Sequence, residues 1–215
     1  KKVGDHLTEV LMRHKGINKK EAKVLALDIL KQVGIPMPEK RIDQYPHEFS
    51  GGMRQRVLIA MALACNPRLL IADEPTTALD VTIQAQILQL LKNLKESNDM
   101  SVILITHDLG VVASLCNRVV VMYGGLIMEE GLVDEIFYEA KHPYTKALLN
   151  SIPKLEENEK SRLNPIKGSA PSLLNPPKGC PFAERCEFAF KKCFQEMPKY
   201  KNFSETHRAM CFLEK

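Results

Sequence analysis

The sequence has little of several features that would place it in other classes of protein. Its net charge is only +4, from 30 basic and 26 acidic residues, which is too weak a bias to indicate nucleic-acid binding. No apolar run approaches the roughly 20 residues that a membrane-spanning helix needs, and no secretory signal opens the chain. The phosphate-binding pattern G-x-x-x-x-G-K-[ST] is absent too. We therefore expect a cytosolic protein with reduced cysteines and, because the chain begins at Lys1 without an initiator Met, a piece of a longer protein.

What the sequence does contain is enough apolar material for a folded core. Hydrophobic residues make up 45% of it and charged residues 26%, as in ordinary globular domains. Residues 1–50 have a helical pattern, and the apolar residues within 21–34 fall on one helical face. A Ser50-Gly51-Gly52 break then precedes a further helix through about Ala64.

The middle of the chain alternates strands with helices. Residues 69–72 and 101–106 are short apolar runs that predict buried strands, and Asp80 is placed to cap the helix between them. Residues 118–122 and 126–129 predict a hairpin around two glycines. Strands that alternate with helices in this order predict an α/β layer with parallel strands.

The composition changes near the end of the chain. Residues 156–179 are rich in Lys, Glu, Asn and Pro, which is typical of a linker, and residues 180–215 hold four of the six cysteines. We therefore predict three parts: a helical subdomain over 1–64, an α/β part over 65–155, and a linker with a small cysteine-rich domain over 156–215.

Two adjacent acids close the first predicted strand. Asp73 and Glu74 follow the apolar run at 69–72, and neighbouring residues on a strand point to opposite faces, so the two acids can do different work. Phosphoryl transfer requires an Asp that holds Mg²⁺ and a second group that positions the attacking water. Taken alone, the pair could equally cap a following helix.

Two more segments complete a candidate nucleotide site. The Ser50-Gly51-Gly52 turn opens a helix and so offers backbone N–H groups and the positive end of the helix dipole to a phosphate, although a plain helix cap has the same pattern. His107 directly follows the second strand and can donate a hydrogen bond to a terminal phosphate, although a lone histidine is usually an ordinary residue.

Taken together, these segments resemble the ABC-type ATPase family over residues 1 to about 155. Ser50-Gly51-Gly52-Met53-Arg54-Gln55 matches the family's signature motif, 69–73 with Glu74 matches Walker B and the catalytic glutamate, Ala78-Leu79-Asp80 matches the D-loop, and His107 matches the switch histidine. The resemblance implies an α/β fold: a partial P-loop (RecA-like) ABC ATPase core with a helical subdomain, which uses ATP and Mg²⁺.

The resemblance also implies a role for each matched residue. Asp73 would bind Mg²⁺ through water, Glu74 would polarise the attacking water, and His107 would contact the γ-phosphate. Asp80 would communicate across a head-to-tail dimer of ATPase subunits. The residues that would act on the ATP of the partner subunit are Ser50, Gly51, Gly52 and Met53, the last in place of the family's commonest Gln.

The chain departs from the family in one respect. The P-loop and the Q-loop of the family lie ahead of the point where this chain begins, and neither is present. The backbone amides and the lysine of a P-loop cradle the phosphates, so we expect this chain alone to be inactive. An absent N-terminal part explains the departure better than a degenerate ATPase, because Glu74 and His107 are intact.

Two stretches resemble the D-type ATPase subunits of oligopeptide and dipeptide importers, whose relatives also serve nickel. They are 44–49 (QYPHEF) and 142–149 (HPYTKALL). The resemblance implies a peripheral subunit at the cytoplasmic face of the membrane that energises import of di- or oligopeptides. Its implied partners are a second ATPase subunit, identical or not, two transmembrane permease subunits and, through the complex, an extracytoplasmic substrate-binding protein. The alternatives are import of nickel or another small solute, and a soluble ABC ATPase that acts on ribosomes or DNA.

The cysteines of the tail are spaced C-x5-C-x6-C-x17-C and are Cys180, Cys186, Cys193 and Cys211. Four thiolates can ligate a [4Fe-4S] cluster or a zinc ion, and the tight C-x2–4-C pairs that structural zinc prefers are missing. Several peptide-importer ATPases carry a C-terminal iron–sulfur cluster, so the resemblance favours iron. The alternatives are zinc, cysteines without a metal, and a redox-sensing module.

The remaining cysteines and one histidine receive ordinary structural interpretations. Cys65 and Cys116 lie in apolar helical segments, and we predict that both are core residues. His207, four residues before Cys211, is predicted to be a surface residue, with replacement of one metal ligand as the alternative.

Overall fold

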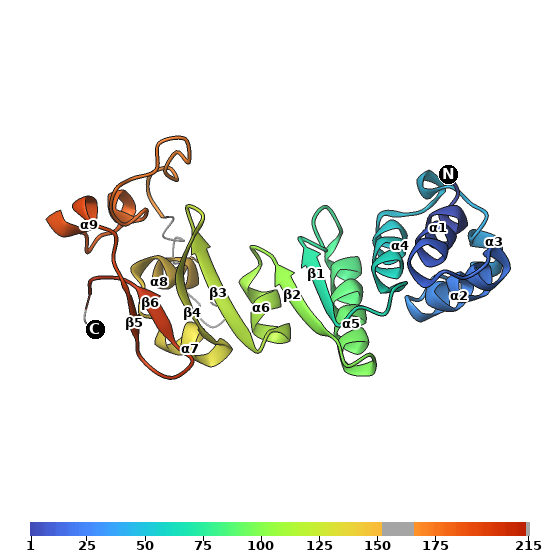
Figure 1. The fold of residues 1–215 in the computed structure, drawn as a ribbon. Helices are drawn as coiled ribbons and strands as arrows, with labels where there is room; N and C mark the ends of the chain where they lie inside the picture. Colours follow the sequence, from blue (N-terminus) through green and yellow to red (C-terminus); the bar gives the residue numbers. More distant parts are fainter. Residues whose placement is uncertain (152–165, 214–215) are drawn as a thin grey trace, which may run out of the picture. The chain divides into compact units, whose positions relative to one another are not determined.

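The computed structural model describes residues 1–151 and 166–213 (Figure 1). The chain divides into two compact units, residues 1–111 and 112–215. The first unit contains α1 (Val3–Lys15), α2 (Lys19–Gln32), α3 (Pro38–Arg41), the short 3-10 turn η1 (Pro46–Glu48), α4 (Gly51–Leu63), β1 (Leu69–Asp73), α5 (Val81–Ser97) and β2 (Ser101–Ile105). Helix α6 (Leu109–Leu115) runs across the division between the units.

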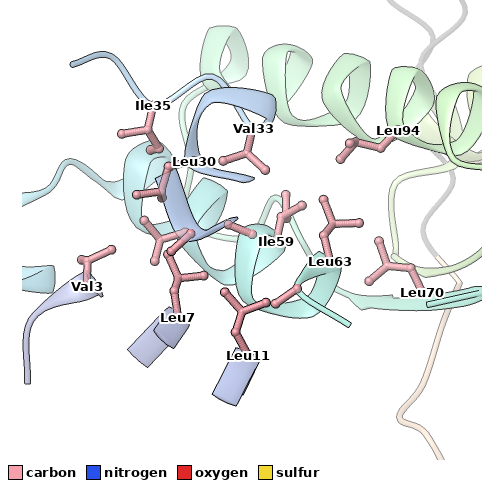
Figure 2. Close-up of a cluster of buried hydrophobic side chains, with 14 of the residues drawn as sticks. Val3, Leu7, Leu11, Leu30, Val33, Ile35, Ile59, Leu63, Leu70 and Leu94 are labelled. Atoms are coloured by element: carbon pink, nitrogen blue, oxygen red, sulfur yellow. The ribbon is translucent and has the colours of Figure 1, made fainter. Parts of the chain in front are cut away.

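The helices of the first unit pack around one apolar core, part of which is drawn in Figure 2. On α1, Leu7 and Leu11 are four residues apart and therefore lie on the same face, where both are fully buried. Helix α2 begins at Asn18, whose side chain accepts hydrogen bonds from the N–H groups of Lys20 and Glu21 (both 3.0 Å). Such a cap stabilises a helix by about 1 kcal/mol. The predicted helical character of residues 1–50 is confirmed.

The two strands of the first unit are parallel, as predicted. Residue 69 of β1 lies opposite Ser101 of β2, and the register continues to Asp73 opposite Ile105. The prediction that both strands are buried is wrong for one face, because Ile71 is 61% and Ile103 48% exposed. Leu70 and Ala72 on the other face are buried in the core. Within the described residues, this pair of strands is therefore covered on one face only.

The second unit contains a hairpin followed by short elements. They are β3 (Arg118–Tyr123), β4 (Leu126–Leu132), α7 (Val133–Glu139), α8 (Pro143–Asn150), the 3-10 turn η2 (Ala183–Arg185), α9 (Lys191–Gln195), β5 (Tyr200–Asn202) and β6 (Arg208–Met210). The predicted hairpin is confirmed. Gly124 and Gly125 at its tip have φ values of 57° and 79°, the left-handed pair of a type I′ turn, which suits glycine. Among the described residues, no helix is long and apolar enough to span a bilayer.

The cysteine-rich tail shares a sheet with the hairpin. Strand β6 pairs antiparallel with β4 and with β5, which gives the four-stranded order β3-β4-β6-β5 (Figure 1). Residues 180–213 therefore extend the sheet of β3 and β4. The predicted boundary at 155/156 lies outside the described residues, as does the first part of the predicted linker, 156–165. The three-part division of the chain stays a prediction.

Candidate functional site

The carboxyl ends of β1 and β2 carry the predicted acids. Asp73 is the last residue of β1 and is exposed. Glu74 follows it, and its backbone N–H donates to the carbonyl of Ile105 at the end of β2 (2.9 Å). The φ of Glu74 is 44°, a left-handed conformation that is costly for a residue with a side chain and is common at functional sites. The strand pair thus fixes the backbone from which the Glu74 carboxylate projects.

Two side chains hold the Glu74 carboxylate. Thr77 donates from Oγ1 to Glu74 Oε2 (2.7 Å), and His107 Nδ1 lies 3.4 Å from Glu74 Oε1. The hydrogen bond from Thr77, and after it the one from His107, lowers the pKa of Glu74, because donors to a carboxylate favour its charged form. The side chains of His107 and Glu74 are 82% and 47% exposed, so water and phosphate can reach both groups.

Ser50 opens the signature helix α4. Its side-chain oxygen accepts a hydrogen bond from the Met53 N–H (3.4 Å), and the Met53 side chain packs, partly buried, against the core of the first unit. Ser50 itself is exposed. The start of this helix, where the positive end of its dipole lies, is therefore at the surface, where an anion can approach it.

The glycines of the signature also have a packing role. Gly52 is buried, and a Cβ at this position would lie 2.5 Å from Cγ2 of Ile83 in α5. A Cβ on Gly51 would lie 3.3 Å from Cδ2 of Leu79. The D-loop residue next to Leu79, Asp80, caps α5 by accepting a hydrogen bond from the Ile83 N–H (3.0 Å). The signature and the D-loop are therefore neighbours.

In the second unit the four tail cysteines line one small cavity of about 20 Å³, which is room for about one water molecule. The other side chains lining the cavity are apolar, except for His142. Burial raises the pKa of Cys180 to about 11 and also raises the pKa values of Cys186 and Cys211. The charges of neighbouring thiolates, Cys193 among them, act in the same direction.

The chain closes tightly around this cavity. The N–H of Cys180 donates to the carbonyl of Cys193 (2.8 Å). At the preceding position, a Cβ on Gly179 would lie 2.1 Å from the same carbonyl oxygen, so any side chain here would displace the loop. The N–H of Leu213 donates to the sulfur of Cys211 (3.5 Å), one of the backbone hydrogen bonds that lower the thiol pKa values against the effect of burial.

The donor set of the cavity fits a thiolate-bound group, although its side chains are not gathered around the position of a single metal ion. Four thiolates suit zinc or an iron–sulfur cluster, and backbone N–H groups directed at the sulfurs stabilise such clusters. Within residues 1–151 and 166–213, however, no group of three or more His, Cys, Asp or Glu side chains is placed to hold a metal ion. The cavity therefore offers four thiols around one space, without a preformed site for a single ion among the described residues.

Glu129 on β4 is the centre of a buried polar cluster that the sequence did not indicate. It is fully buried. Its Oε1 accepts from the N–H of Lys141 (2.6 Å) and lies 2.7 Å from Nε2 of His207, and its Oε2 accepts from the N–H of His142 (3.0 Å). The prediction that His207 is a surface residue is wrong, because this contact leaves it only 2% exposed. Cys65, predicted to be a core residue, is exposed.

His142 caps α8 and has one unused polar atom. Its Nδ1 accepts a hydrogen bond from the N–H of Tyr144 (3.0 Å), and a nitrogen that accepts carries no proton, so the neutral ring has its proton on Nε2. Burial lowers the pKa of His142 to about 4, which keeps the ring neutral at pH 7. In the described part of the chain Nε2 has no hydrogen-bond partner, and leaving such a donor unpaired costs about 1–3 kcal/mol.

Two protein-family models match parts of this chain. The ABC transporter family model matches residues 2–77, and the model for the oligopeptide/dipeptide transporter C-terminal region matches residues 128–193. The oligopeptide transport ATP-binding protein OppD of Bacillus subtilis is 59% identical over 212 residues, which are 99% of this chain. This chain belongs to the ABC transporter ATP-binding proteins of the OppD/DppD type. The dipeptide transport ATP-binding protein DppD of Bacillus subtilis is 55% identical over 212 residues, and OppD of Haemophilus influenzae is 53% identical.

Solved ABC structures share the fold of this OppD/DppD-type chain. A metal-chelate type ABC transporter in an inward-facing conformation has a TM-score of 0.59 and 27% identity, covering 69% of this chain and 57% of that one. The cassette MJ0796, in a dimeric post-hydrolysis state with ADP and phosphate, has a TM-score of 0.53 and 32% identity, covering 61% and 56%. This confirms the α/β ABC ATPase fold. The chain spans 59% to 65% of the length of the three relatives named above.

Proposed function

We propose that the protein containing this chain is the ATP-hydrolysing subunit of an importer of di- or oligopeptides. The observation that carries the proposal is the placement of Glu74 at the end of β1, bonded to Thr77 and 3.4 Å from His107. In this proposal Glu74 polarises the attacking water, Asp73 holds Mg²⁺ through water, and His107 contacts the γ-phosphate. The contacts of Thr77 and His107 with the Glu74 carboxylate support this role, because they orient the group that must position the water.

The remaining proposed site residues act between subunits. The exposed start of α4 supports a role for Ser50 and Gly51 toward ATP held by a second ATPase subunit, with Gly52 and Met53 supporting the turn. Asp80, beside this helix, communicates across the dimer. The solved cassette described above as a dimer supports this arrangement. We place the assembly at the cytoplasmic face of a membrane with two permease subunits and an extracytoplasmic substrate-binding protein.

The peptide substrate is supported by the names of the relatives, which are oligopeptide and dipeptide transport proteins at 53% to 59% identity. Nickel or another small solute is the alternative, because the permease and the binding protein select the substrate. A soluble ABC ATPase without membrane partners is the alternative from another class. Co-purification with permease subunits distinguishes it from an importer.

Replacement of Glu74 tests the catalytic part of the proposal. In a protein that joins this chain to a P-loop segment, Glu74→Gln should lower ATP turnover by about 100-fold or more and leave ATP affinity unchanged, because only water activation is lost. Glu96→Gln, on the exposed side of α5, is the matched control and should turn over normally. Wild-type turnover in Glu74→Gln would remove this residue from its role.

The 215-residue chain alone should neither hydrolyse ATP nor bind it tightly. It has the water-activating residues but no G-x-x-x-x-G-K-[ST] loop to cradle the phosphates. Isothermal calorimetry should therefore detect only weak binding. A micromolar Kd would contradict the proposal, since about 8 kcal/mol of binding would then come from a site without its phosphate cradle.

We also propose that Cys180, Cys186, Cys193 and Cys211 hold one [4Fe-4S] cluster, as a structural cross-link of the tail. Their shared cavity and the backbone hydrogen bonds to the thiols support this proposal. Protein purified without oxygen should be brown and contain about four irons per chain, and Cys193→Ser should lower that content while α1 to α5 keep their stability. Colourless protein with one zinc ion, or with no metal, would refute the iron assignment.

A further inference from the structure

Besides the thiols, one polar side chain lines the cysteine cavity. Its outer ring nitrogen makes no hydrogen bond to the described residues. His142 lines the cavity together with all four cysteines. It is 1% exposed, so water does not satisfy its ring. Its Nε2 is one of only four buried side-chain nitrogen or oxygen atoms in the described residues without a hydrogen-bond partner.

The inner side of the same ring is fixed by the backbone. The Tyr144 N–H donates to Nδ1 (3.0 Å), and the His142 N–H donates to Glu129 Oε2 (3.0 Å). The first contact forces the ring proton onto Nε2, because an N–H cannot donate to a nitrogen that already carries a proton. A metal ligand needs a lone pair, and the Nε2 of this tautomer has none to offer. The ring is therefore built as a hydrogen-bond donor and not as a fifth ligand.

The support behind His142 is rigid. Glu129 also accepts a hydrogen bond from the Lys141 N–H (2.6 Å), so its carboxylate binds the N–H groups of two consecutive residues, Lys141 and His142. The carboxylate is itself held by His207, whose Nε2 lies 2.7 Å away. The Pro143 that follows fixes the first turn of α8, which suits a helix start. The ring consequently keeps one orientation, and the donor is organised before any group binds in the cavity.

We propose that His142 is a positioning residue for the cysteine-held group, and that its Nε2–H donates a hydrogen bond to a sulfur of that group. This inference rests on the proposed [4Fe-4S] cluster. Donors to the sulfurs of a cluster stabilise the more negative, reduced form and so raise its reduction potential. The start of α8 would thereby contact the group held by the tail cysteines as well as Glu129 on strand β4 of the hairpin.

The test compares two substitutions in the 215-residue chain, purified without oxygen. His142→Asn keeps the helix cap, because its side-chain oxygen can accept from the Tyr144 N–H, and it removes the Nε2 donor. His207→Gln alters the same buried cluster around Glu129 without touching the cavity lining. Each protein is analysed for iron, and its reduction potential is measured by anaerobic optical titration.

We expect four irons in all three proteins and a lower potential for His142→Asn alone. The ratio of reduced to oxidised cluster at a fixed potential should fall about tenfold, which is about 59 mV for a one-electron couple. An unchanged potential in a brown His142→Asn protein would overturn this inference and leave the proposed cluster standing. An equal shift in His207→Gln would also overturn it, because the effect would then come from the buried cluster. Colourless wild-type protein would overturn the inference together with the proposed cluster.

Discussion

The two units of this chain place their polar groups in opposite environments. In the first unit the proposed catalytic residues face solvent, with His107 82% and Glu74 47% exposed at the side chain. In the second unit Glu129, His142 and His207 are at most 2% exposed. The exposed pair can receive a ligand from outside, whereas the buried cluster can act only on what lies next to it inside the protein.

This difference separates residues that can bind a ligand from residues that stabilise the fold. An exposed carboxylate such as Glu74 pays little desolvation cost, so it remains available for a water and a phosphate. A buried carboxylate such as Glu129 is stable only because three donors surround it. Substitutions should therefore alter chemistry in the first unit and stability in the second, and the following predictions test that separation.

The largest stability effect is expected at Glu129. Glu129→Gln puts an amide N–H₂ where a carboxylate oxygen accepted hydrogen bonds, so one backbone or imidazole donor loses its partner inside the protein. We expect the free energy of unfolding of the second unit to fall by about 3–5 kcal/mol. Urea unfolding followed by tyrosine fluorescence measures this, because four of the five tyrosines lie in residues 112–215.

The matched control for Glu129 lies close to it in the sequence. Glu139 ends α7, and its side chain is 69% exposed beside Lys141. Glu139→Gln should change the stability by no more than about 0.5 kcal/mol. Equal losses in Glu129→Gln and Glu139→Gln would refute the view that burial makes the difference.

The acid stability of the second unit should depend on His142. The folded protein keeps this ring neutral down to about pH 4, because burial lowers its pKa from 6.5, whereas the unfolded chain protonates it near pH 6.5. Between these values the unfolded state binds the extra proton, so stability is full above pH 6.5 and falls as the pH is lowered toward 4. The loss should reach about 3 kcal/mol. Hydrogen exchange of α8 and β4 at pH 7 and pH 4.5 should show it, and His142→Asn should abolish the difference.

The sequence predicted the first unit better than the second for a physical reason. Its motifs are local: the acids follow a strand, and Ser50 and Asp80 cap the helices they precede. The cluster of Glu129 and His207 joins residues 78 positions apart, and a side chain in an alternating strand gives no sign of such a partner. Thr77 was missed as well, although a hydroxyl three residues after Glu74 in a turn is a local signal that could have been used.

The smallest effect is expected at Asp80, where structure and proposed function can be separated. Its carboxylate caps α5 (3.0 Å to the Ile83 N–H), so Asp80→Ala should destabilise the first unit by about 1 kcal/mol, while Asp80→Asn keeps a capping oxygen and should change stability by no more than a few tenths of that amount. If Asp80 also communicates between ATPase subunits through its charge, Asp80→Asn in a protein that joins this chain to a P-loop segment should slow ATP turnover although its melting temperature is unchanged. If turnover follows stability, so that only Asp80→Ala is slow, then Asp80 is a helix cap and no more. In that case the exposed residues of the first unit would divide further, into those that contact nucleotide and those that only support the fold.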